Sequence, residues 1–247
     1  MLRAFSADLH IHTLLSPCGE IEMIPPLIVQ SALSAGLDII AITDHNSCEN
    51  ARAVIEAAEG SGLRVLPGLE VQSLEGVHLL CLFDTVEQAE MMQEAVYERL
   101  PDVELSERSM QEQMVVDSGA NFVKYCTSPI SLPTSMNIEE IFEKAYALEG
   151  LTIPSHIDRL ETGLCGVLGM LPETPAFEAV EVSRNLSTSE ARLRYPSIGN
   201  LPVFRSSDAH WLSAIGESRT MLYMKHRSVV EIRMACRGEG GRRVADA

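Results

Sequence analysis

The sequence predicts an α/β fold in which a parallel sheet is covered by helices. Short apolar runs alternate with amphipathic segments in the first part of the chain, which is the β-α-β-α-β rhythm of such a sheet. The length of 247 residues suits one α/β domain, including a barrel. Apolar residues make up 46% and charged residues 22%, so the composition is that of a globular protein with an ample core.

The first part of the chain carries four apolar runs and two helical segments. Two prolines open the first helical segment, where a missing N–H is tolerated, and Gly36 suits its C-terminal cap. We expect strands at residues 7–11, 39–43, 65–70 and 77–83, with helices at 26–35 and 50–58.

The character of the chain changes between about residues 84 and 150, which are polar and rich in Met, Gln and Glu. We expect a helical insertion here, with helices at 86–100, 106–117 and 138–149. The insertion either forms a cap over the functional site or is a solvated elaboration without contact to it.

The strand rhythm then resumes. We expect strands at 151–154, 179–182, 203–206 and 220–224, and a last helix at 229–236. These elements predict a single domain over residues 1–237. The Gly/Arg-rich segment 238–247 is expected to be a flexible tail.

The net charge of −16 argues against long duplex DNA as a partner, because DNA affinity rests on Lys and Arg. It allows a small phosphorylated substrate, since bound cations would offset a carboxylate-rich site. No apolar run approaches twenty residues, so we expect no membrane span and no membrane partner. We see no leader peptide, and the six scattered cysteines form no C-x-x-C pair, so we expect a reduced, cytoplasmic protein.

Polar side chains gather at the ends of the predicted strands. His10 and His12 end the first strand, and residues two apart on a strand point to the same face. In a parallel α/β barrel the carboxyl ends of the strands meet at one mouth. His78 alone lies near the start of a strand, which fits if that strand enters from the mouth side. The set contains six of the seven histidines and two acids: His10, His12, His45, Glu70, His78, His156, Asp208 and His210.

This set indicates a shared metal site. A single His or Asp at a strand end is usually a structural polar residue or a helix cap, but eight such residues are hard to explain in that way. Imidazole and carboxylate ligands suit Zn, Mn or Fe. Eight ligands exceed the needs of one ion, so we expect two or three divalent ions. Such a cluster can clamp a phosphate and activate a water molecule.

The motifs resemble those of a known family. D-L-H-x-H-T, T-D-H, G-x-E, two isolated histidines and S-D-A-H, spread over residues 7–217, resemble the PHP (polymerase and histidinol phosphatase) superfamily. The resemblance implies a distorted (β/α)7, TIM-like barrel and a phosphoesterase with two or three metals. It also implies how the ligands are grouped. The first metal takes His10, His12, Glu70 and Asp208, the second takes Glu70, His78 and His156, and the third takes His45 and His210.

The loop after the first strand departs from the family pattern. The family commonly supplies a His or Asp ligand to the third metal from this loop, which here reads Ser-Pro-Cys-Gly-Glu over residues 16–20. Cys18 lies at or next to that position, and a thiolate there would favour Zn or Fe. Alternatively, Cys18 is a small turn residue, and either Glu20 or no side chain completes the site.

Four further residues are candidates for supporting roles. Asp8 and Asp44 lie next to ligand histidines, and metal-bound histidines usually donate their second N–H to a carboxylate. Either could instead be an ordinary strand-end cap. Arg159 and Arg184 follow predicted strand ends, and their forked guanidinium groups match phosphate oxygens.

The predicted function is hydrolysis of a phosphomonoester, or of a short nucleotide or oligonucleotide phosphoester, by a metal-activated water. The catalytic set is expected to be His45, His210 and Asp208, with a histidine relaying the proton to the leaving alcohol if the third site is empty. Two alternatives stay open within the family resemblance. One is histidinol phosphate as the substrate, and the other is a non-catalytic accessory module of a DNA polymerase.

Overall fold

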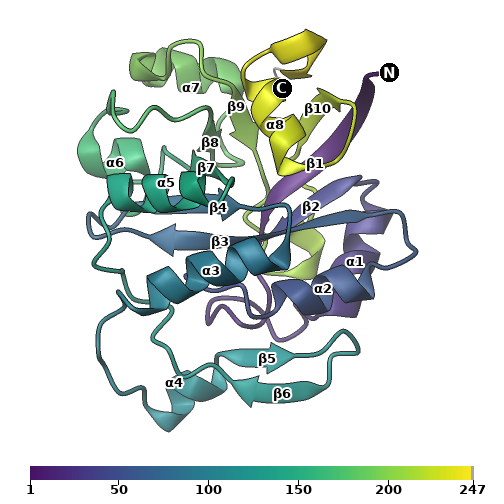
Figure 1. Cartoon of the computed structure of the whole chain (residues 1–247), viewed down its shortest axis with the longest axis vertical. Coiled ribbons are helices and arrows are strands. Elements are labelled where there is room, and N and C mark those ends of the chain that lie inside the picture. The colour runs from purple at the N-terminus through teal and green to yellow at the C-terminus, as the bar shows by residue number, and fades with distance from the viewer. Residues whose placement is uncertain (246–247) are drawn as a thin grey trace.

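The computed structural model describes residues 1–245, and its centre is a curled sheet of seven strands in the order β11-β10-β1-β2-β3-β4-β7 (Figure 1). Two further pairs of strands, β8–β9 and β5–β6, lie outside this sheet. The strands are β1 (Arg3–Ile11), β2 (Ile39–Ile42), β3 (Arg64–Gln72), β4 (His78–Leu82), β5 (Met114–Val116), β6 (Phe122–Tyr125), β7 (Leu151–Pro154), β8 (Val180–Val182), β9 (Val203–Arg205), β10 (Thr220–Met224) and β11 (Arg243–Val244).

The helices lie along the sheet and its connections. They are α1 (Pro25–Ser34), α2 (Ala51–Ala57), α3 (Val86–Tyr97), α4 (Glu107–Gln111), α5 (Ile138–Ala147), α6 (Leu164–Leu168), α7 (Thr188–Arg194) and α8 (Val229–Cys236), with short 3-10 turns η1 (Pro196–Ile198), η2 (Leu212–Ala214) and η3 (Glu239–Gly241). Within residues 1–245, no helix is long and apolar enough to cross a membrane.

The α/β class is confirmed, but the sheet is mixed and not parallel as predicted. Strands β1, β2 and β3 are parallel, whereas β4 runs antiparallel to β3, β7 antiparallel to β4, and β10 antiparallel to β1. The loop between β3 and β4, residues 73–77, is too short for a crossover, so these strands must form a hairpin. This direction puts His78, the first residue of β4, opposite Gln72 at the carboxyl end of β3.

The sheet is buried on both faces, which explains why its strands read as continuous apolar runs. Ile39 and Ala41 of β2 belong to one apolar cluster, which α8 closes. Ile40 and Ile42 point the other way, into the cluster that contains residues of α1, α2 and α5. The polar ends of the strands are therefore the only part of β1–β3 at which a functional site can form.

The insertion contains the expected helices α3 and α5, and both begin with a capping box. The predicted helix 106–117 is only partly correct, because α4 is short and a hairpin, β5–β6, follows it. Two valines make β5 a better strand than helix. The side chain of Asn50 holds the hairpin, donating to the Met114 carbonyl at 3.1 Å and accepting from the Val116 N–H at 3.0 Å.

The prediction of a flexible tail from Gly238 differs from the structure. Within the described residues, η3 and β11 follow, and β11 pairs with β10. Arg242 is 6% exposed, and two of its nitrogens donate to the Glu231 carboxylate of α8 at 2.7 Å. This buried ion pair ties the segment to the domain. Residues 246–247 lie outside the described part of the chain.

We expect Glu231→Gln to destabilise the protein at neutral pH. The hydrogen bonds from Arg242 hold the pKa of Glu231 at about 2, below its ordinary value of 4.5. A lowered carboxylate pKa contributes stability above the unfolded pKa and loses it as the pH falls. The free energy of unfolding of the variant should therefore be about 2 kcal/mol lower than that of the unmodified protein at pH 7. This difference between the two proteins should become smaller at pH 3.

Urea unfolding of both proteins at the two pH values measures this gap. Glu56→Gln, a change at an exposed glutamate of α2, is the matched control and should leave stability unchanged. A gap that stays constant between pH 7 and pH 3 would contradict the ion-pair assignment.

Candidate metal centre

The structure brings all eight predicted strand-end ligands into one cluster. They come from the ends of β1 and β3, the start of β4, and the loops after β2, β7 and β9. Four overlapping groups each place three ligand atoms within 4.8 Å of one another: His12, His45 and His210; His10, His12 and Asp208; His10, Glu70 and His156; His45, Glu70 and His78.

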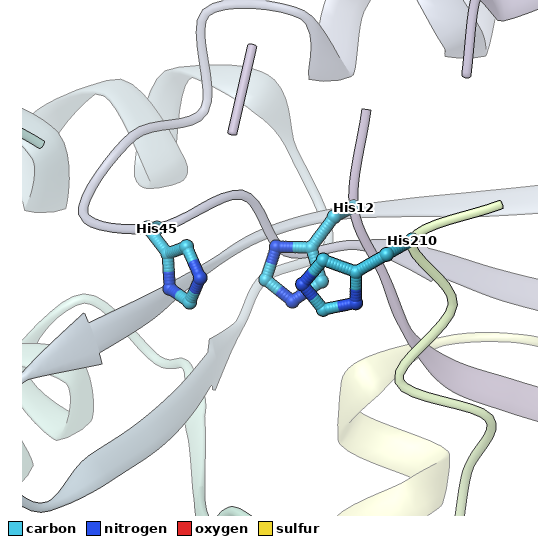
Figure 2. Close-up of side chains that lie close together, drawn as sticks. All are labelled: His12, His45 and His210. Atoms are coloured by element: carbon cyan, nitrogen blue, oxygen red, sulfur yellow. The ribbon is translucent and has the colours of Figure 1, made fainter. Parts of the chain in front are cut away.

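Figure 2 shows the first of these groups, in which three imidazoles from distant parts of the chain face one another. His12 directly follows β1, His45 follows β2, and His210 lies in the loop after β9. The ring centroid of His12 lies 4.6 Å from that of His45 and 4.2 Å from that of His210. Three rings at this separation can direct nitrogen atoms to one ion.

Glu70 lies at the centre of the cluster and belongs to two of the groups. It is 1% exposed, and its two oxygens lie 3.0–3.4 Å from five imidazole nitrogens. These nitrogens belong to His10, His12, His45, His78 and His156. A carboxylate with both oxygens surrounded in this way has the geometry of a bridge between two ions.

The donor set fits bound metal ions. Two ligand atoms at about 2.1 Å from one ion, in tetrahedral geometry, lie roughly 3.4 Å apart. The Nε2 atoms of His10 and His12 are 3.1 Å apart, and each lies 3.2 Å from Oδ1 of Asp208. Two imidazole nitrogens that face each other this closely need a proton or a cation between them.

Hydrogen bonds behind the cluster fix which nitrogen of the His12 ring and of the His210 ring faces it. His12 Nδ1 lies 3.0 Å from Ser16 Oγ, which donates to Asp44 Oδ1 at 2.7 Å. The serine therefore accepts from His12 Nδ1–H, leaving the Nε2 lone pair for a metal. His210 Nδ1 donates to the Asp208 carbonyl at 2.9 Å, with the same result. Asp44 thus supports a ligand through Ser16 rather than directly.

Glu181 in β8 supports the centre and was not predicted from the sequence. Its Oε1 accepts from His10 Nδ1 at 3.0 Å and from the His156 backbone N–H at 3.1 Å. Glu181 is 2% exposed. The signal for it was present, because an acid in the middle of the apolar run Val180–Val182 must find a polar partner inside the protein.

Asp8 has a different role from the predicted one. Its carboxylate accepts from the backbone N–H groups of Ser207 and Gly216, each at 2.9 Å, and no hydrogen bond joins it to a ligand imidazole within the described residues. Burial raises its pKa to about 6. Asp8 therefore fastens to β1 the loop that carries Asp208 and His210.

The cluster without ions balances its carboxylates with protons. Burial alone would lower the pKa of His12, but the Asp208 and Glu70 carboxylates raise it to about 9. Burial and the neighbouring His12 lower the pKa of His210 to about 3. The pKa of Glu70 is well below its ordinary value, because the histidines around it outweigh its burial. Since a ligand imidazole must be neutral, metal uptake at pH 7 should release protons.

Two ligands have unusual backbone conformations. His156 and Asp208 have φ values of 28° and 50°, in the left-handed region that non-glycine residues rarely adopt. Such residues cost about 1–3 kcal/mol each and persist where their surroundings hold them. Asp8 and Glu181 supply the bonds that hold these loops. The backbone strain at His156 and Asp208 therefore lowers the stability of the fold while it places these two side chains in the cluster.

A cavity of about 530 Å³ opens onto the cluster. Its lining includes His45, His78 and His210 from the cluster, together with Cys18 and the loop 159–162. No lining residue comes from the insertion 84–150, all of which the structure describes. The insertion therefore does not cover the cavity, but it contacts the loop that carries His45, because Asn46 Nδ2 donates to the carbonyls of Ile130 and Leu132, each at 2.9 Å.

The two candidate phosphate-binding arginines lie in different surroundings. Arg159 lines the cavity, is 47% exposed, and donates to Asp208 Oδ2. Arg184 pairs with Glu217 at 2.9 Å and lies over the Trp211 ring, 5.2 Å from its centroid. It does not line the cavity, so the role predicted for Arg184 gains no support from its position.

With the geometry established, the chain can be compared with known proteins. The model of the PHP domain family matches residues 8–127. The predicted PHP resemblance is confirmed. The matched residues of this chain include His10, His12, His45, Glu70 and His78. The structure places His156, Asp208 and His210 in the same cluster.

Individual relatives are similar in part. An uncharacterized protein of Methanocaldococcus jannaschii is 32% identical over 78 residues, covering 28% of this chain and 46% of the relative. The lesion-specific endonuclease EndoQ of Pyrococcus furiosus superposes with a TM-score of 0.75 at 21% identity, covering 98% of this chain and 58% of EndoQ. A Bifidobacterium adolescentis protein classed as a metal-dependent phosphoesterase has a TM-score of 0.58 at 19% identity, covering 86% and 90%. This chain thus spans little more than half of EndoQ.

The prediction that excluded long duplex DNA is wrong. A structure of endonuclease Q with a 27-mer duplex, carrying an abasic lesion at the active site, superposes on 98% of this chain with a TM-score of 0.73. The exclusion rested on the net charge, which sums over the whole surface. DNA responds to the local potential of the face it touches, so a negative sum does not rule out a duplex.

Proposed function

We propose that this PHP domain is a metal-dependent phosphoesterase that holds two or three divalent transition metal ions, chosen from Zn, Mn and Fe. The observation that carries the proposal is that the four candidate ligand groups overlap. Each of the residues Glu70, His10, His12 and His45 belongs to two of these groups. The PHP family match and the names of the structural relatives support hydrolysis of phosphoester bonds. We also propose the family's distorted (β/α)7 barrel, with β8–β9 between β7 and β1. Its support is the bond from Ile157 N–H to the Glu181 carbonyl and the bridge between Ile11 and Ala209.

The residues around the centre have different proposed roles in hydrolysis. When bound, the ions supply a nucleophilic water at neutral pH and Lewis-acid stabilisation of phosphate oxygens. Arg159, at the cavity rim, is placed to pair with a non-bridging phosphate oxygen. His45 and His210 line the cavity, so one of them can pass a proton to the leaving alcohol where it is free of metal. Asp208 holds its carboxylate among the rings of His10 and His12.

The proposed substrate is a phosphoester of a nucleotide or a nucleic acid. The specific observation in favour is that EndoQ superposes over nearly the whole chain with a TM-score of 0.75. A phosphomonoester such as histidinol phosphate is the second candidate, and a non-catalytic module is the third. The open cavity of about 530 Å³ is large enough for a nucleotide-sized group, which favours the first candidate.

A substrate panel, run with elemental analysis of the same preparation, tests this proposal. The panel contains p-nitrophenyl phosphate, histidinol phosphate, a single-stranded oligonucleotide, an intact duplex and a duplex with one abasic site. Cleavage of a nucleic acid supports the first candidate, and turnover of monoesters alone supports the second. Bound metal without hydrolysis of any phosphoester would overturn the enzymatic function.

Cys18 is proposed as the remaining ligand of the third metal, with His45 and His210. The Cys18 residue is exposed and lines the same cavity as these two histidines. We expect Cys18→Ser to lower the metal content by about one ion per chain, because a hydroxyl is a far weaker ligand than a thiolate. Elemental analysis measures the content, and an unchanged count would remove Cys18 from the site.

A further inference from the structure

A second pocket lies at the opposite end of the sheet from the metal centre. It has a volume of about 490 Å³, and its lining includes Arg3, Asp38, Arg64, Lys225, His226 and Arg227. Arg3 starts β1 and pairs with Met224, so Lys225 lies beside it (Figure 1). His10 lies seven residues further along β1, which corresponds to about 23 Å. The pocket is therefore separate from the centre.

The pocket gathers positive charge in a strongly acidic chain. Four of its lining residues are Lys or Arg and one, Asp38, is acidic, although the whole chain has 19 basic and 35 acidic residues. The side chains of Arg3 and Lys225 are exposed and form no hydrogen bond or ion pair with any described residue. Like charges that gather without partners repel one another, and a bound anion relieves this repulsion.

The two inner arginines are held in place by backbone carbonyls. Arg227 donates to the carbonyls of Gly62 and Asp38. Arg64 donates to the Asp84 carbonyl at 2.8 Å, and its Nε is buried and has no partner among the described residues. Carbonyls position a guanidinium without neutralising it, although the Asp84 carboxylate, 3.9 Å from an Arg64 nitrogen, offsets part of the Arg64 charge. A buried N–H without an acceptor is costly, so the Arg64 guanidinium, which belongs to a pocket-lining residue, retains unused donor capacity.

We propose that this cationic pocket binds a phosphate group at a site independent of the metal centre. Forked guanidinium groups match tetrahedral phosphate oxygens, and an ammonium adds a point charge. The phosphate belongs either to a small phosphorylated molecule or to the backbone of a nucleic acid. Both sources present the same oxyanion, so the experiment must distinguish them.

The imidazole of His226 is a built-in reporter. It is exposed in the pocket lining, and it is the one histidine of the seven that lies outside the metal centre. NMR spectra of the histidine ring signals, assigned with His226→Gln, follow it directly. At constant pH and ionic strength, added inorganic phosphate should shift the His226 signals in a saturable way. Phosphate bound at the distant metal centre shifts the other six rings instead.

The test variant carries Arg3→Glu and Lys225→Glu, two changes at exposed and unpaired side chains. Phosphate affinity measured at His226 should fall at least tenfold. Arg52→Glu with Arg108→Glu changes the net charge equally on exposed helix surfaces and should leave the affinity unchanged. Thermal unfolding confirms that each variant is folded.

A short duplex DNA forms the second arm. If the natural ligand is a nucleic-acid backbone, DNA shifts His226 at lower concentration than phosphate does. The test variant should then reduce the slope of log K against log salt by about 2. If the ligand is a small phosphorylated molecule, phosphate shifts His226 and DNA does not. The proposal is overturned if neither probe shifts His226, or if the test variant shifts as the unmodified protein does.

Discussion

Glu70→Gln is expected to abolish phosphoester hydrolysis and to lower the metal content of the protein. The Glu70 carboxylate lies among five imidazole nitrogens and belongs to two of the four ligand groups. An amide keeps the shape of the side chain but lacks the charge and one acceptor oxygen. Loss of several kcal/mol of metal-derived stabilisation corresponds to a fall in turnover of about 1000-fold or more.

Two measurements on the same samples decide this prediction. Elemental analysis gives the number of ions per chain, and a hydrolysis assay with the best substrate of the panel gives turnover. Glu56→Gln serves as the control for the chemical change at an exposed glutamate. Full activity with unchanged metal content would show that Glu70 does not bridge two ions.

Glu181→Gln is expected to weaken metal binding about 10- to 100-fold. Glu181 accepts from both the His10 imidazole and the His156 backbone, so its charge makes His10 a more basic ligand. Both bonds go to the same oxygen, Oε1, so the amide oxygen can still accept them, but the side chain no longer carries the charge. Because Glu181 is buried behind the candidate ligands and does not line the cavity, added metal should restore turnover.

The metal titration separates this role from a purely structural one. A structural defect lowers the melting temperature and is not rescued by metal, whereas a positioning defect shifts the metal dependence of activity. Glu217→Gln, an exposed glutamate that pairs with Arg184, is the matched control. An unchanged apparent metal affinity in Glu181→Gln would contradict the assignment.

Several elements were predictable because local signals agree with the final packing. The strands Leu151–Pro154 and Thr220–Met224 and the helix Val229–Cys236 have the predicted bounds. The two strands are short apolar runs, and Ser228 caps the helix. The clustering of the eight candidate ligands was also predictable, because buried sheets leave their polar residues at strand ends.

Other features depend on information that no local pattern carries. Apolar runs do not state a strand's direction, so the antiparallel β4 follows only from the shortness of the loop before it. The β5–β6 hairpin depends on Asn50, which lies 64 residues from Met114. The position of β11 depends on the ion pair between Arg242 and Glu231. Glu181 could be assigned only once β8 was placed beside His10, 171 residues away in the chain.

The distribution of ligands along the chain makes the centre a product of long-range order. Three of the four ligand groups need a residue beyond position 150, and only His45, Glu70 and His78 come from one stretch. Closing such distant loops costs entropy, so these contacts form late in folding. A metal ion that binds the complete cluster would stabilise only the native topology, because one ligand group joins His12 to His210. Metal occupancy in this protein therefore reports on the integrity of the whole fold and not on one local motif.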